Sequence, residues 1–321
     1  MSKKMTMAEI SRQLGISTMT VSRYFNGGYV SEENRLKIDA IVKESHYTPN
    51  IFARSIRSQS NIIGFIAPRI DSYTTSLVIK GALAAANESQ VRMLFHATGF
   101  NHESECQAVR EFNGLNALGT IIIASKHSVE ETFYRTLDNV VFIGKNTPHH
   151  CCLYYPDHAA IKALVSHTIT QLKQQQAPLA AVHYIYDERM LSSRTKLMQA
   201  TITDTVPELN LSLQALANSE DKAGYQAVQL QPNHVYFCAT DNIAIRLYRR
   251  AKEQQLKIGH NVWIVGMGDY DYSDLLVPSL TTVAFNYYQV GYQAVKKLLK
   301  RDFSSVEGTF DIKMRESSQF L

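Results

Sequence analysis

Apolar and polar residues follow two different patterns along this chain, and the first pattern gives way to the second near residue 60. Before that point the apolar positions recur at helical spacing on both sides of Gly15: Met7, Ile10 and Leu14 precede it, and Val21, Tyr24 and Phe25 follow it. Because glycine readily ends a helix, this pattern predicts two very short helices joined by a tight turn.

The polar residues around these helices predict where each one begins. Ser17 occupies the position of an N-cap, whose hydroxyl accepts a hydrogen bond from an otherwise unpaired N–H of the second helix. After a turn at residues 26–28, Ser31 precedes a third helix that we expect to run through Ser45. Three short helices of this kind are typical of a helix-turn-helix headpiece that binds DNA.

From Asn61 onward the pattern of apolar residues predicts strands that alternate with helices. Two series of short apolar runs predict strands: 62–67, 91–95, 119–125 and 140–144, and then 179–186, 211–216, 234–239 and 262–268. Amphipathic stretches between them, such as 77–88, 103–116 and 130–137, predict helices. Continuous apolar strands alternating with helices indicate parallel sheets covered on both faces, so we expect two α/β lobes with a ligand cleft at the carboxyl ends of their strands.

The charge distribution supports a role in DNA binding for the first segment. Residues 1–60 contain nine Lys or Arg and five acidic residues, an excess of +4 that equals the net charge of the whole chain. Residues 61–321 therefore carry equal numbers of basic and acidic side chains. An excess of positive charge confined to one small segment is expected where a protein faces phosphate groups.

The residues from Thr6 to Ser60, including "TVSRYFN" and "YTPNIFARSI", resemble the N-terminal region of the lactose/galactose repressor (LacI/GalR) family. This resemblance implies a homodimeric repressor, or a tetramer, that binds a pseudo-palindromic operator. It implies a DNA contact set of Thr18, Met19, Ser22, Arg23, Asn26, Tyr29, Asn50, Ala53, Arg54, Ile56 and Arg57. Within this set Ile56 replaces the family's usual leucine as the hinge residue that enters the minor groove.

The segments "CATDNIAI" and "VGMGDYDYSDLLVPSLTTV" are similar to motifs of the same family's effector domain, whose fold is that of periplasmic sugar-binding proteins. The implied organisation is a headpiece at 1–49, a hinge helix and linker at 50–60, and a two-lobed effector-binding and dimerisation domain at 61–321. We place one lobe at about 61–157 plus 286–310, and the other at about 158–285 plus 311–321, because the family's chain crosses between the lobes three times.

Candidate effector contacts lie past the predicted strands or match ligand positions in the family: Arg69, Asp71, Ser72, Lys145, Tyr154, Arg194, Thr240, Asp241, Asp269 and Tyr287. Arginine suits a sugar or a phosphate because its planar guanidinium donates two parallel hydrogen bonds. Alternatives remain for several of them. The alternatives to a ligand contact are that Asp241 caps a helix beginning at Asn242, that Arg69 pairs with Asp71, that Lys145 is solvated, and that Tyr154 and Tyr287 belong to the core.

The effector class follows from two departures from the family pattern. Gly268 stands where the family commonly has an aspartate that accepts hydrogen bonds from sugar hydroxyls, and Arg69 lies in "RIDS", which resembles repressors of trehalose and sucrose uptake systems. Losing an acid and gaining a guanidinium favours an anionic ligand, so we predict a disaccharide phosphate. The alternatives are a free sugar or a phosphocarrier protein acting as corepressor, and more remotely a sugar-binding protein without a role on DNA. The emission of Trp263 is predicted to report ligand binding directly.

No enzyme, cofactor or metal site is predicted. The chain contains no G-x-S-x-G, phosphate-binding P-loop or H-E-x-x-H motif. The only dense set of potential metal ligands, residues 149–152, is expected to form a surface loop, and the four cysteines are expected to form no disulfide. Without an apolar signal region or a membrane-spanning run, the protein is expected to be cytoplasmic and to have no membrane partner.

Overall fold

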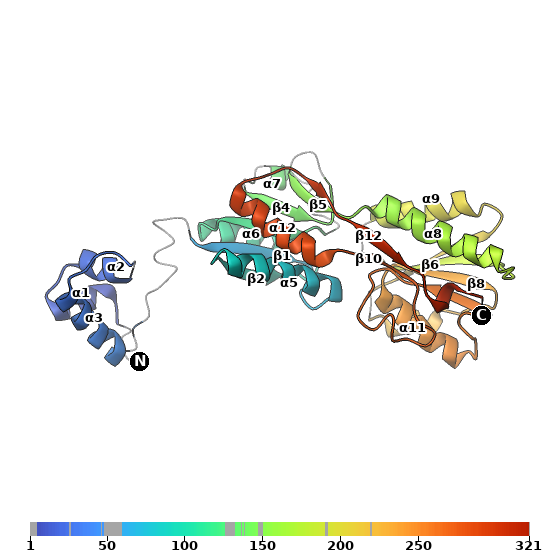
Figure 1. Ribbon diagram of the computed structural model, residues 1–321, viewed down its shortest axis with the longest axis horizontal. Coiled ribbons are helices and arrows are strands. Elements are labelled where there is room, and N and C mark those ends of the chain that lie inside the picture. The colour runs from blue at the N-terminus through green and yellow to red at the C-terminus, as the bar shows by residue number, and fades with distance from the viewer. Residues whose placement is uncertain are drawn as a thin grey trace. The chain divides into compact units, whose positions relative to one another are not determined.

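The computed structural model describes residues 5–25, 27–45, 47, 60–125, 132–135, 137, 139–146, 150–189, 192–218 and 220–320. The chain forms two compact units, 1–60 and 61–321 (Figure 1). Among the described residues of the first unit, the helices are α1 (Met7–Leu14), α2 (Thr18–Phe25) and α3 (Glu32–Ser45).

Local side-chain bonds set the limits of the short helices in the first unit. Thr6 and Glu9 form a reciprocal capping box at the start of α1, and Gly15 ends this helix in the left-handed conformation with φ 64°. The predicted cap of α2 is confirmed, since the Thr20 N–H donates to Ser17 Oγ at 3.1 Å. Four fully or largely buried side chains form the small core: Ile10, Val21, Val30 and Ile38.

The second unit contains two lobes, each built on a parallel sheet as predicted. In the first lobe, the strands lie in the order β11-β5-β4-β3-β1-β2. Their bounds are β1 (Ile62–Ala67), β2 (Arg92–Ala97), β3 (Gly119–Ile123), β4 (Val140–Ile143), β5 (Cys151–Tyr154) and β11 (Val306–Glu307). The helices of this lobe are α5 (Tyr73–Glu88), α6 (His102–Gly114), α7 (Thr132–Arg135) and α12 (Tyr287–Lys300).

Helices α5 and α12 lie side by side, although 198 residues separate the end of α5 at Glu88 from the start of α12 at Tyr287 (Figure 1). Two glycines allow this close approach. A Cβ atom at Gly81 would lie 1.9 Å from the Tyr288 carbonyl oxygen, and one at Gly291 would lie 1.9 Å from the Val78 carbonyl oxygen. Any larger residue at either position would therefore force the two helices apart.

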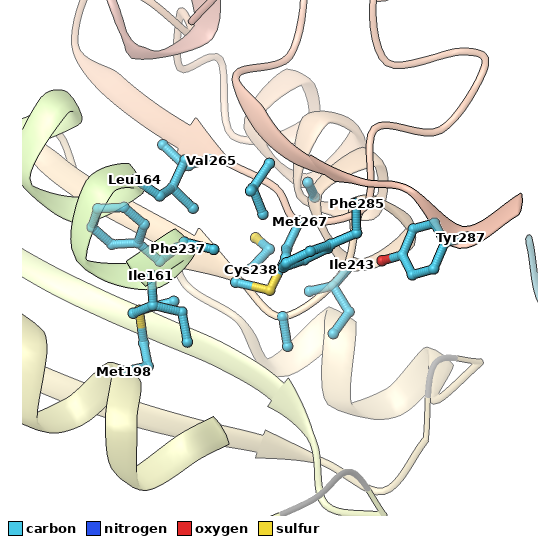
Figure 2. Packing of buried hydrophobic residues seen from close by; sticks show 14 of the residues in the cluster. Ile161, Leu164, Met198, Phe237, Cys238, Ile243, Val265, Met267, Phe285 and Tyr287 are labelled. Carbon is cyan, nitrogen blue, oxygen red and sulfur yellow. The ribbon is translucent and has the colours of Figure 1, made fainter. Parts of the chain in front are cut away.

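The second lobe has the strand order β7-β6-β8-β9. Its strands are β6 (Ala181–Asp187), β7 (Asn210–Leu216), β8 (His234–Cys238) and β9 (Val262–Val265). Its helices are α8 (Asp157–Gln174), α9 (Ser192–Thr205), α10 (Lys222–Ala227) and α11 (Asp241–Glu253). Side chains from α8, β8 and β9, including Ile161, Leu164, Phe237 and Val265, lie close together in its core (Figure 2).

Three short segments connect the lobes. They join β5 to α8, β10 (Thr282–Phe285) to α12, and β11 to β12 (Phe310–Lys313). Strands β10 and β12 pair antiparallel with each other, and a 3-10 turn at Glu316–Ser318 follows them. This ribbon is not among the predicted strands, because neither half has an apolar run long enough to indicate a strand by itself.

The structure corrects two expectations. Residues Cys151 and Cys152 do not lie in a surface loop: they form the buried strand β5, while His149 lies outside the described residues. Trp263 is fully buried in β9, where its Nε1–H donates to the Gln319 carbonyl oxygen at 3.0 Å. Its indole does not line the ligand cavity described below, so its emission reports the packing of the second lobe instead.

All four cysteines are buried, and none of them forms a disulfide. Among the described residues, no group of three or more His, Cys, Asp or Glu side chains is arranged to hold a metal ion. No helix in the described part of the chain has the length and apolar character needed to cross a membrane.

A pair of histidines in the second lobe makes its stability depend on pH. His183 and His234 share a hydrogen bond of 2.8 Å, and the His183 ring stacks on Tyr236 with centroids 4.5 Å apart. Burial, together with the neighbouring His234, lowers the pKa of His183 to about 4. An unfolded histidine has a pKa of about 6.5, so the unfolded state binds more protons between these two values, and stability falls as the pH decreases through this window.

We therefore expect the urea midpoint of the second lobe, followed by Trp263 emission, to fall between pH 7 and pH 5. This decrease should be smaller in His183→Gln than in the wild type, because the variant lacks the group that must remain neutral on folding. The matched control is His158→Gln, which replaces an exposed histidine on α8 of the same lobe. An identical pH dependence in the wild type and His183→Gln would contradict the assignment.

Candidate functional site

A cavity of about 260 Å³ lies between the two lobes, at the carboxyl ends of their central strands. In each sheet the strand order reverses direction at one place, between β1 and β3 and between β6 and β8. Both places contribute to the cavity wall: Pro68, Arg69, Ala124 and Ser125 come from the first, and Asp187, Arg189 and Thr240 come from the second. Ligands of open α/β sheets bind at such positions, so the cavity is the candidate effector site.

Arg69 lies at the mouth of the cavity and is paired with acidic side chains from both lobes. Its Nε and Nη2 each donate to Asp71 at 2.9 Å, and Nη2 also donates to Glu220 at 3.3 Å. The Asp71 and Glu220 side chains are 67% and 69% exposed. Hydrogen bonding from Arg69 lowers the pKa of Asp71, so this carboxylate stays charged at neutral pH.

Arg189 lies on the second lobe near Arg69 and is held from two sides. It donates a bidentate pair of hydrogen bonds to Asp187, at 3.0 Å and 2.6 Å, and its guanidinium lies 4.5 Å from the centre of the Phe100 ring. Phe100 belongs to the first lobe, so this cation–π contact crosses the cleft. The charged head of Arg189 is thus oriented before any ligand binds.

Arg194 lies deeper in the cavity, where solvent is largely excluded. Its guanidinium donates to both carboxylate oxygens of Asp157, at 3.2 Å and 2.7 Å, and the two side chains are only 16% and 24% exposed. Burial opposes the charge on Arg194, but the attraction of Asp157 outweighs it and raises the pKa of the arginine. Arg194 therefore stays charged, and its fixed donors lie beside Tyr155 and Tyr287.

Aromatic rings form much of the remaining wall and connect the lobes. Tyr270 lines the cavity from the second lobe, and Tyr73 of the first lobe stacks on it with centroids 4.3 Å apart. The Tyr73 hydroxyl donates to Asp271 at 2.5 Å, and the Asp271 N–H donates back to this hydroxyl at 3.1 Å. Burial, followed by the contact with Asp271, raises the pKa of Tyr73 to about 12, so it remains a neutral donor.

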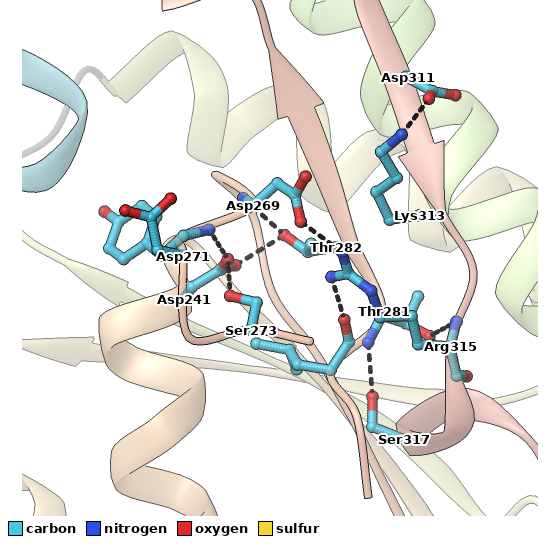
Figure 3. A network of polar contacts seen from close by, with 12 residues as sticks. Asp241, Asp269, Asp271, Ser273, Thr281, Thr282, Asp311, Lys313, Arg315 and Ser317 are labelled. Carbon is cyan, nitrogen blue, oxygen red and sulfur yellow. Dashed lines mark hydrogen bonds and ion pairs between the residues drawn. The ribbon is translucent and has the colours of Figure 1, made fainter. Parts of the chain in front are cut away.

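Asp241 holds the segment that carries Tyr270. Figure 3 shows Asp241 beside two of its other partners, Ser273 and Thr282. The carboxylate of Asp241 is fully buried and accepts hydrogen bonds from the Tyr270 N–H at 2.9 Å, Ser273 Oγ at 2.6 Å and Thr282 Oγ1 at 2.7 Å. Burial raises the pKa of Asp241, while the hydrogen bonds from Ser273 and Thr282 oppose this rise. The helix α11 begins at Asp241 itself and is capped by Thr240, so Asp241 is not the cap considered above.

Four of the ten predicted effector contacts line this cavity: Arg69, Ser72, Arg194 and Thr240. A fifth, Tyr287, lines an adjoining cavity of about 150 Å³ that shares Arg194 with the first. The other five are not wall residues: Asp71, Lys145, Tyr154, Asp241 and Asp269. Asp71 pairs with Arg69, and Asp241 accepts the three hydrogen bonds described above. Asp269 pairs with Arg315 at 2.7 Å (Figure 3). Tyr154 does not line the cavity, whereas its neighbour Tyr155 does.

Several wall residues were missed by reasoning from the sequence. They are Thr74, Thr75, Phe100, Ser125, Tyr155, Asp187, Arg189, Asn242 and Tyr270. Asp187 is the last residue of strand β6 and Arg189 follows closely, so the rule used for Arg69 could also have found them. Phe100 and Tyr270 had no such signal, because they lie in loops whose paths depend on tertiary contacts.

On the headpiece, α2 presents an exposed face with the predicted contacts Thr18, Met19 and Arg23, while Ser22 is half-buried. Met19 is 63% exposed, and Tyr29 just beyond the helix is 90% exposed. The Arg23 guanidinium lies 3.6 Å from Met19 Sδ, so the two side chains share one surface. The predicted contacts Asn26, Asn50, Ala53, Arg54, Ile56 and Arg57 lie outside the described residues.

Comparisons with known proteins agree with both halves of this architecture. Residues 6–50 match the lacI family of bacterial regulatory proteins, and residues 157–305 match a periplasmic binding protein-like domain. The chain is 26% identical over 302 residues to the sucrose operon repressor of Staphylococcus xylosus, covering 91% of this chain and 92% of that protein. Its fold matches that of a lac repressor dimer bound to operator, with a TM-score of 0.75, 17% identity and coverage of 99% and 100% of the two chains. It also matches the trehalose repressor from Escherichia coli, with a TM-score of 0.66, 18% identity and coverage of 78% and 99%.

Proposed function

The chain joins a lacI-family DNA-binding domain to a periplasmic-binding-protein-like domain and so belongs to the lacI family of bacterial regulators, and from this premise we propose that it represses a carbohydrate-utilisation operon. Its relatives are transcriptional regulators and not enzymes. The sucrose and ribose operon repressors among them support a sugar operon as the target.

On DNA, a homodimer presents two copies of α2 to the major grooves of a pseudo-palindromic operator. The exposed Thr18, Met19 and Arg23 read base edges, and the hinge at 50–60 contributes Ile56 as the wedge in the minor groove. Closure of the cleft on the effector changes how the two lobes sit against each other, and this change releases the hinges from the operator.

Exposed apolar side chains of the second unit support the dimer. Leu83 on α5 and Tyr288 on α12 are 37% and 39% exposed, and Leu275 and Val277 after β9 are 76% and 92% exposed. Helices α5 and α12 are in contact, and burying their apolar side chains against a second copy would stabilise a dimer. We assign these residues to the subunit contact.

The effector is a disaccharide phosphate that binds in the cavity with its phosphate at Arg69. The observation that carries this proposal is the difference between the cavity's ion pairs. The carboxylate partners of Arg69 are about two-thirds exposed, whereas the Arg194–Asp157 pair is largely buried. Exposed ion pairs contribute about 0–1 kcal/mol, so Arg69 exchanges its partners for a dianion at little cost, while Arg194 stays in place to bind sugar hydroxyls.

A neutral sugar is the second candidate, and the charge balance of the cavity favours it. All three cavity arginines already have bidentate carboxylate partners, and the Asp187 carboxylate itself lines the wall. A carboxylate in this position accepts hydrogen bonds from sugar hydroxyls and repels a phosphate. The first candidate therefore predicts tighter binding of the phosphorylated sugar, and the second predicts tighter binding of its neutral parent.

Calorimetric titration of the wild type and of Arg69→Ala with sucrose, sucrose 6-phosphate, trehalose and trehalose 6-phosphate distinguishes the two candidates. We expect the wild type to bind one phosphorylated sugar at least tenfold more tightly than its neutral parent, a difference of about 1.4 kcal/mol. Arg69→Ala should lose this preference and retain any affinity for the neutral sugar.

The matched control is Arg249→Ala, which removes an arginine of the same charge from α11, where its side chain is 83% exposed and pairs with Glu253. This variant should keep the preference of the wild type. Tighter binding of the neutral sugar by the wild type would reject the phosphate and leave the neutral effector.

A further inference from the structure

The mouth of the cavity contains a carboxylate that comes from the opposite lobe to its partner. Arg69 follows β1 in the first lobe, and Glu220 lies between β7 and α10 in the second. Glu220 Oε1 lies 3.3 Å from Arg69 Nη2, the nitrogen that also donates to Asp71 at 2.9 Å. Of these two carboxylates, only Glu220 reaches across the cleft, since Asp71 is two residues from Arg69 in sequence.

Glu220 imitates one feature of the proposed ligand. A carboxylate oxygen at hydrogen-bond distance from a guanidinium N–H occupies the place that a phosphate oxygen would take in a charge-assisted bond. A second cation lies close enough to be influenced by it, because Glu220 and Arg69 both act electrostatically on Arg189. The carboxylate of Glu220 therefore contacts one of two arginines that line the same cavity from opposite lobes.

We propose that Glu220 is a specificity-determining residue that competes as an internal anion with the ligand's anionic group for Arg69. The inference rests on the proposed function, because it concerns the same cavity and the same arginine. Without ligand, the carboxylate joins the lobes at the mouth of the cleft. An anionic ligand displaces Glu220 from Arg69, and a neutral ligand leaves the pair intact.

The exposure of Glu220 makes this exchange feasible. Its side chain is 69% exposed while it is paired with Arg69. The carboxylate is therefore hydrated both when it is paired and when it is displaced, and the exchange changes its hydration free energy little. A phosphate at Arg69 also lies within a few ångströms of the Glu220 carboxylate and repels it. Both effects reduce the affinity for anions and leave the affinity for neutral sugars unchanged.

The test compares the wild type with Glu220→Gln in calorimetric titrations at one fixed ionic strength, using inorganic phosphate, sucrose 6-phosphate and sucrose. Glutamine keeps the size of the side chain and removes its charge. We expect Glu220→Gln to bind both anions about three- to tenfold more tightly than the wild type does, and to bind sucrose within about twofold of the wild type. The full-length chain is used throughout.

Glu208→Gln is the matched control, because Glu208 is a 55% exposed carboxylate of the same lobe that pairs with Lys173 at 2.6 Å and does not line the cavity. Unchanged or weaker anion binding by Glu220→Gln overturns the proposal. An equal gain in anion affinity in Glu208→Gln also overturns it, because the gain would then come from the change in net charge alone. If the wild type prefers sucrose to its phosphate, the phosphate effector fails, while the inorganic phosphate titration still decides the role of Glu220. If no variant binds either anion, both proposals are overturned.

Discussion

A chain that begins at Asn61 will lose at least about a thousandfold in operator affinity while it stays folded and dimeric. The whole net charge of the protein and the proposed base contacts lie in residues 1–60, whereas residues 61–321 are electrically balanced and form a compact unit by themselves. Without the first unit, neither the attraction to phosphates nor the base contacts remain. Fluorescence anisotropy with an operator selected by the full-length chain measures the loss, and sedimentation velocity checks the dimer.

A point variant separates loss of base recognition from loss of the headpiece. Arg23→Ala should cost about 1–3 kcal/mol on the selected operator and relax the preference at one base pair. Arg12→Ala removes an exposed arginine of the same charge from the last turn of α1 and should weaken selected and random DNA alike. Operator binding by the truncated chain at full affinity, or equal losses on selected and random DNA for Arg23→Ala, would contradict the assignment of the DNA surface.

Asp241→Ala will destabilise the second lobe by about 3–5 kcal/mol and will abolish effector binding. The substitution leaves three buried donors without their acceptor: the Tyr270 N–H and the hydroxyls of Ser273 and Thr282. Each unsatisfied buried donor costs about 1–3 kcal/mol, although the hydroxyls recover part of this loss by rotation. Tyr270 then loses its anchor, so the cavity wall and the stacking contact with Tyr73 are lost with it.

Urea unfolding followed by Trp263 emission measures this loss of stability, since Trp263 lies fully buried in the same lobe. Asp241→Asn is the conservative control. Its amide oxygen can keep the two bonds that Oδ2 accepts from Tyr270 and Ser273, and its NH₂ group can donate to Thr282. We expect the asparagine variant to regain most of the stability and of the ligand affinity. Wild-type stability in Asp241→Ala would show that the network does not support the site.

The sequence by itself determined the type and order of most elements, because their signals are local. Apolar runs of strand length separated by amphipathic stretches predicted β1 to β4 of the first sheet and all four strands of the second, but not β5 and β11, and Gly15 with Ser17 predicted the turn between α1 and α2. A buried parallel strand must be apolar on both faces, and a short helix needs a cap and a stop. These requirements act on neighbouring residues and can be read without knowledge of the fold.

Only the tertiary structure decided which charged and polar side chains meet. Arg69 pairs with Glu220 across 151 residues of sequence, and Asp241 accepts hydrogen bonds from residues 29 to 41 positions away. The sequence identified Asp241 and Asp269 as ligand contacts, but packing turned one toward Tyr270 and paired the other with Arg315. A charged group takes whichever partner the fold brings within hydrogen-bond distance, and that choice leaves no periodic pattern along the chain.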